Sequence, residues 1–119
     1  MNLKYILIAL GLIFFVQTIV SILIAWIAKQ IFPYNIAMAI FHSSAILIII
    51  WIGYYNTKTA VGSKVKTALK LHLFIAAFPL IGLLTAPPTE ILLNSITFLV
   101  NLNIGTAIYY FKDKNLVSA

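Results

Sequence analysis

The chain has 119 residues, of which 63% are hydrophobic and 8% are charged. A typical soluble domain is about 45–50% apolar and about 25% charged, and a chain this short cannot bury so large an apolar fraction in one core. The net charge of +6 comes from lysines at the ends of apolar runs, which favours contact with the anionic headgroups of a lipid bilayer and argues against a nucleic-acid-binding protein.

Composition also limits the chemistry that the protein can perform. The absence of cysteine excludes disulfide bonds, thiolate metal sites and cysteine nucleophiles. No carboxylate lies within an apolar run, and the sequence has neither a glycine-rich phosphate loop nor a zinc-protease motif. We therefore expect a protein that is not an enzyme and that has no metal site and no cofactor.

Two apolar runs make up the first half of the chain. Residues 5–28 are long enough to cross a hydrocarbon core of about 30 Å as a helix, and too long for the hydrophobic part of a cleaved signal peptide. A tight turn with Pro33 follows, and Asn35 is the expected N-cap of the second span, residues 36–55. The first half therefore predicts a membrane-spanning hairpin.

The longest polar segment, residues 56–66, is predicted to be a basic loop between this hairpin and a second one. The lysines of the loop and of the helix start that follows are Lys58, Lys64, Lys66 and Lys70. The third span is expected at residues 67–85, with a kink at Pro79, and the fourth at residues 90–111. The whole chain is thus one predicted integral membrane domain.

The distribution of lysines predicts the topology. If the N-terminus is cytoplasmic, only Lys29 lies outside, which matches the excess of basic residues in cytoplasmic loops. The predicted fold class is an all-α membrane protein, an up-down four-helix transmembrane bundle with both termini in the cytoplasm. Abundant isoleucine, lysine and asparagine favour an AT-rich bacterial genome, and hence a bacterial plasma membrane.

Polar side chains within the spans are the candidate functional residues, because they are costly in lipid and usually face the interior of a bundle. Helical spacing places them on one face of the first span and one face of the fourth, and we name this set the polar stripe: Gln17, Ser21, Asn94, Thr97 and Asn101. Gln17 and Asn101 are expected at similar depth, where their amides can form a hydrogen bond. The stripe would serve either as a helix contact or as a polar pathway.

The two histidines are candidates for pH sensing or for ligand binding. His42 and His72 are expected to differ in depth by roughly 12 Å within a core of about 30 Å. Axial ligands of one haem must lie within about 4 Å of each other, so a shared haem is disfavoured. We expect His72 to pack on a face of small residues and His42 to be satisfied by Ser43 and Ser44.

Three functions remain open from the sequence. The leading expectation is an accessory, assembly or immunity-type membrane subunit that works through lateral helix contacts, in a homo-oligomer or in a larger membrane protein complex. An alternative is a small oligomeric channel or carrier for an uncharged solute or lipid, lined by the polar stripe. A third is a haem- or quinone-binding subunit that uses His42 or His72.

Overall fold

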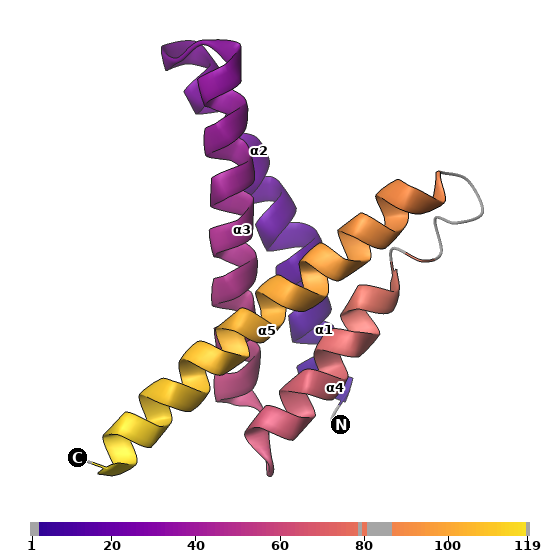
Figure 1. The fold of residues 1–119 in the computed structure, drawn as a ribbon, viewed down its shortest axis with the longest axis vertical. Coiled ribbons are helices and arrows are strands. Elements are labelled where there is room, and N and C mark those ends of the chain that lie inside the picture. The colour runs from indigo at the N-terminus through magenta and orange to yellow at the C-terminus, as the bar shows by residue number, and fades with distance from the viewer. Residues whose placement is uncertain (1–2, 79, 81–86, 119) are drawn as a thin grey trace.

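The computed structural model describes residues 3–78, 80 and 87–118, with side chains up to Lys112. Within these residues every element is a helix, and they form four helical segments (Figure 1). The first segment consists of α1 (Leu3–Gly11), a π-helical turn η1 (Leu12–Val16) and α2 (Gln17–Ile31). The other three are α3 (Tyr34–Thr59), α4 (Lys64–Ala77) and α5 (Pro88–Ser118).

Three helices are long and apolar enough to cross a membrane: Leu3–Ile31, Tyr34–Thr59 and Pro88–Lys112. They correspond to the first, second and fourth predicted spans, so the all-helical class and three long apolar helices at the predicted places are confirmed. The predicted third span begins in α4 and ends outside the described residues. Its expected kink at Pro79 also lies outside the described residues.

The basic loop is shorter than the sequence predicts. α3 continues to Thr59, so residues 56–59 are helical, and only Ala60–Ser63 connects α3 to α4. Gly62 makes this tight turn possible, because its φ of 81° lies in the left-handed region that favours glycine. The start of α3 also differs from the expectation, since the N-cap position is Pro33 and Asn35 lies inside the helix.

The π-helical turn is not predicted by hydropathy or spacing. The backbone N–H of Gln17 bonds to the carbonyl of Leu12, five residues earlier, which widens the helix at this point. Buried residues continue through this turn, at Ala9, Ile13 and Ser21.

Helices α3 and α5 form the central crossing of the fold. Gly53 and Gly105 lie where the two helices touch, and a Cβ on either glycine would overlap the backbone of the facing helix, at Leu102 and at Ile50. α2 packs on α3, and α4 packs on α5. The apolar core follows this arrangement and includes Ala9, Ile13, Ile49, Ile52, Leu71, Ile75 and Leu102.

The two hairpins cross and then diverge, so the molecule is broad, with extents of 46 × 39 × 24 Å. Figure 1 shows α5 lying obliquely across the lower part of α3, with the α2–α3 turn far from the start of α5. The start of α1, the α3–α4 turn and the end of α5 all lie toward the bottom of Figure 1, with the end of α5 at the far left. This shared end is what the predicted topology requires, whereas its cytoplasmic location stays a prediction.

Candidate functional site

The polar stripe does not form one continuous buried face. Ser21 and Asn101 are buried, but Asn94 and Thr97 are exposed on α5. The Gln17 side chain donates a hydrogen bond to Ser21 Oγ at 3.2 Å, within its own helix. Because α2 packs mainly on α3 rather than on α5, the expected hydrogen bond between Gln17 and Asn101 is not formed.

The two histidines occupy different surroundings. His42 is exposed on α3, where its ring contacts the edge of Phe41 at 5.2 Å between centroids. His72 is 0% exposed on α4. Ala68 and Ala76, the small residues expected on the same face of α4, are buried with it, but the sequence does not reveal the polar partners that His72 has on α3 and α5.

A buried polar cluster surrounds His72 where α3, α4 and α5 meet. We name it the His72 cluster, and its members are Asn56, Thr57, His72, Asn103 and Thr106. All except Asn103 are at most 3% exposed. Since buried polar groups destabilise a fold unless they are paired, the hydrogen bonds of this cluster are part of what fixes the helix positions.

The imidazole of His72 bridges two amides. Its Nδ1 lies 3.0 Å from Asn103 Oδ1, and its Nε2 lies 3.5 Å from Asn56 Nδ2. A neutral ring with its proton on Nδ1 satisfies both contacts, because Nδ1–H donates to the carbonyl oxygen and Nε2 accepts from the amide N–H. The cluster thus favours one neutral tautomer.

A chain of hydroxyl groups continues from the imidazole to the helix crossing. Thr106 Oγ1 lies 3.4 Å from His72 Nδ1 and 2.8 Å from Thr57 Oγ1. Thr57 donates to the backbone oxygen of Gly53 at 2.9 Å. Since the Thr57 proton is used there, Thr106 is the donor to Thr57, and the hydrogen bonds run in one direction toward Gly53.

Tyr5 connects the first helix to the same region. Its hydroxyl donates to the backbone oxygen of Asn56 at 2.6 Å. Ala60 N–H, at the end of α3, bonds to Thr57 rather than to Asn56. The Asn56 carbonyl therefore accepts from two side chains, Tyr5 at 2.6 Å and Thr59 of its own helix at 3.5 Å. Tyr5 and the His72 cluster therefore join α1, α3, α4 and α5 at a single level of the molecule.

The His72 cluster holds its imidazole between hydrogen-bond partners on two other helices. Both ring nitrogens of His72 already have partners, so a metal or haem would have to break one of these contacts to bind there. Among the described residues no three His, Cys, Asp or Glu side chains lie close enough to hold a metal ion, and no buried side-chain N or O atom lacks a hydrogen-bond partner.

The four lysines of the predicted basic loop and of the helix start after it are all exposed. Among the described residues, Lys64 and Lys112 contact aromatic rings. Lys58, Lys66 and Lys70 lie at the surface. Lys64 donates to the Lys58 backbone oxygen at 2.7 Å and lies 5.8 Å from the centre of the Tyr109 ring. It thereby caps the last turn of α3.

Lys112 forms the matching contact from α5. Its Nζ lies 3.3 Å from the Tyr54 hydroxyl, and the Tyr54 and Tyr109 rings meet edge to face at 5.7 Å. Ammonium groups and aromatic rings attract each other in this geometry. The contacts join the ends of α3 and α5 to the start of α4, so the basic end of the molecule is packed and not an open loop.

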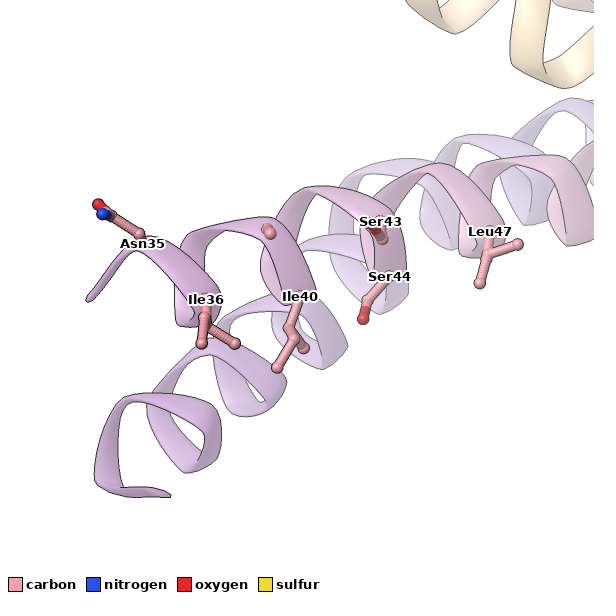
Figure 2. A pocket seen from close by; sticks show the side chains of 7 residues that line it. Asn35, Ile36, Ile40, Ser43, Ser44 and Leu47 are labelled. Atoms are coloured by element: carbon pink, nitrogen blue, oxygen red, sulfur yellow. The ribbon is translucent and has the colours of Figure 1, made fainter. Parts of the chain in front are cut away.

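Several openings border α3. One of about 270 Å³ lies between α2 and α3 and is lined by Ala25, Trp26, Lys29, Tyr34, Ala37 and Met38. A pocket of about 220 Å³ at the basic end is lined by Lys4, Tyr5, Ile8, Tyr55, Asn56, Thr59 and Val61. A shallow groove at the other end is lined by one helix alone, and Figure 2 shows Asn35, Ile36, Ile40, Ser43, Ser44 and Leu47 along it. The groove is therefore an uncovered face of α3, whereas the pocket lies between two helices.

Comparison with known proteins gives no relative. No family model, no curated protein sequence and no solved structure matches the chain. The function must therefore be argued from the chain itself.

Proposed function

We propose that the chain is a non-catalytic integral membrane protein, an accessory, assembly or immunity-type subunit that acts through lateral helix contacts. It would work as a homo-oligomer or within a larger membrane protein complex. We place it in the bacterial plasma membrane with both termini and the α3–α4 turn in the cytoplasm. The three candidate spans and the shared lysine-rich end support this placement.

The observation that carries the proposal is the exposure of His42 and Asn94 on apolar helices. His42 lies about 12 Å from the start of α3, and Asn94 about 9 Å from the start of α5, at 1.5 Å per residue. Both side chains are exposed, and neither has a hydrogen-bond partner among the described residues. Thr97 is different, because its hydroxyl bonds to the Leu93 carbonyl of its own helix.

An unpaired polar group that faces hydrocarbon is costly, and such groups normally contact a neighbouring helix. His42 and Asn94 belong to the first halves of α3 and α5. Figure 1 shows that these halves diverge from the crossing. A helix from a second copy or from another subunit would supply the missing hydrogen bonds. The exposed polar residues therefore favour lateral association over a monomer surrounded by lipid.

The test is co-purification from membranes of differently tagged copies, together with mild crosslinking to capture other subunits. His42→Leu and Asn94→Leu should each weaken association by about 3- to 30-fold, since an interhelical hydrogen bond contributes roughly 0.6–2 kcal/mol. Ile96→Leu is the matched control, because it changes an exposed apolar residue of the same helix. A monomeric mass with no crosslinked partner, or equal losses in all three variants, would contradict the proposal.

The alternatives draw less support from the positions of their residues. A pathway lined by the polar stripe would need its members to converge, whereas Asn94 and Thr97 are exposed and Gln17 bonds within its own helix. A haem or quinone site at His72 would compete with the Asn56 and Asn103 contacts. A haem or quinone site at His42 would use that exposed side chain but would leave the exposed Asn94 without a role.

A further inference from the structure

We propose that the pocket at the basic end of the molecule binds the phosphate group of an anionic membrane phospholipid. The pocket lies between the start of α1 and the end of α3, beside the α3–α4 turn. Its volume of about 220 Å³ is below the roughly 300–1,000 Å³ of sites that enclose a whole drug-sized ligand. It is large enough for a headgroup, and the acyl chains would remain in the bilayer.

One side of the pocket suits a phosphate. Lys4 supplies a positive charge, and Tyr55 supplies a phenolic hydroxyl that makes no hydrogen bond to any described residue. The Tyr55 ring is held in place by stacking on Trp51, with centroids 5.6 Å apart. A phosphate oxygen accepts hydrogen bonds from both kinds of donor, and those from a charged donor are the stronger ones.

The surrounding charges favour an anion as well. The lysine-rich end carries Lys58, Lys64 and Lys66, all exposed near the α3–α4 turn. Glu90, the one carboxylate among the described side chains, lies at the far end of α5. The sequence also places Asp113 at the end of α5, between Lys112 and Lys114, but lysines outnumber acidic residues at this end, so an approaching anion meets a positive field.

The other side of the pocket is apolar and continuous with the lipid-facing surface. Val61 is 83% exposed and Ile8 is 43% exposed, so both offer apolar area that no described residue covers. A phospholipid places its phosphate beside its first acyl carbons, which matches a site with a polar and an apolar wall. A soluble phosphate would gain nothing from Val61 and Ile8, and for this reason we assign the site to a lipid.

The pocket shares a wall with the His72 cluster. Asn56 lines the pocket, and its side chain contacts His72 while its backbone oxygen accepts from Tyr5. A headgroup in the pocket would therefore hold α1 against α3 at the level where the helices are joined. Lipid binding should therefore raise the unfolding temperature of the protein. Binding can also be measured directly.

The experiment is a titration of the purified full chain in detergent with short-chain phosphatidylglycerol, followed by native mass spectrometry. Phosphatidylcholine of the same chain length is the neutral comparison. The wild type should retain phosphatidylglycerol preferentially, and Lys4→Gln should weaken this retention about fivefold. Lys66→Gln removes the same charge from the same end but outside the pocket, so retention should fall by much less than for Lys4→Gln.

Tyr55→Phe provides a second variant that keeps the ring stacked on Trp51 and removes only the hydroxyl, and it should also weaken retention. Helical circular dichroism of each variant checks that the fold is intact. Equal retention of the two lipids by the wild type, or equal losses for Lys4→Gln and Lys66→Gln, would overturn the site. Displacement of the lipid by an equal concentration of inorganic phosphate would overturn the lipid assignment in favour of a soluble anion.

Discussion

His72 is the residue whose side chain joins the most helices. One neutral imidazole pairs with Asn103 on α5 and Asn56 on α3, although it belongs to α4. Removal of a buried partner leaves the remaining polar groups unsatisfied, which costs more than the bond itself contributed. The stability of the fold should therefore depend on this side chain more than on any exposed polar residue.

We expect His72→Leu to lower the free energy of unfolding by about 1–3 kcal/mol, because two amides lose their partner in a buried site. His42→Leu is the same substitution at an exposed position and should change stability by less than about 0.5 kcal/mol in detergent. Unfolding by titration with a denaturing detergent measures both variants. Equal effects would mean that the His72 contacts contribute nothing.

At the scale of helices, the crossing of α3 and α5 depends on two residues without side chains. Any Cβ at Gly53 or Gly105 would overlap facing backbone, and backbone cannot move aside as a side-chain end can. Close approach of this kind is the usual role of small residues in membrane helix contacts.

Gly53→Ala and Gly105→Ala should each destabilise the protein by about 1–3 kcal/mol, the range for overpacking of a close contact. Gly11→Ala is the control within α1, because a Cβ there meets nothing within 4 Å. It should be neutral or stabilising by roughly 0.5–1 kcal/mol, since alanine favours a helix more than glycine does. Thermal unfolding of the three variants measures these changes in stability. A loss of stability in Gly11→Ala as large as in the other two would contradict the role of the close contact.

The extent of each helix was partly predictable. Apolar length predicts the spans within Leu3–Ile31, Tyr34–Thr59 and Pro88–Lys112, because a bilayer requires long apolar helices. Hydropathy does not predict that α3 continues through Asn56 and Thr57, since both residues are polar and resemble a loop. Their helical state depends on polar partners from other helices, which local sequence does not contain.

The candidate site was harder to predict than the helices, because it depends on the angle at which whole helices cross. Periodicity places Asn94, Thr97 and Asn101 on one face, but it says nothing about the angle at which α5 meets α3. The oblique crossing buries Thr106 and exposes Asn94. The spacing of Asn103 and Thr106, one helical turn apart, was the available signal for a polar contact with His72.

The arrangement of the ends makes a prediction about topology. Ser63→Cys lies in the α3–α4 turn and Asn35→Cys at the other end of α3, and each would be the single cysteine of the chain. A membrane-impermeant maleimide should label Ser63→Cys only in inside-out vesicles and Asn35→Cys only in right-side-out ones. Labelling of both from the same side would contradict a membrane-spanning α3.

Because α3 and α5 cross far from the α2–α3 turn, a change in their crossing angle would move that turn much more than the crossing itself. Gly53 lies at the crossing, and we call it the pivot. It is 19 residues from the start of α3, so the part of α3 between the pivot and the α2–α3 turn is about 28 Å long. A rotation of only about 5° at the pivot would displace the far tip by roughly 2.5 Å over that length. Two side-chain contacts that link α3 to α5, the Thr57–Thr106 pair and the bridge from Asn56 through His72 to Asn103, involve α3 residues between the pivot and the near end of α3. Small rearrangements among these few side chains are therefore magnified into a change in how far the outer halves stand apart.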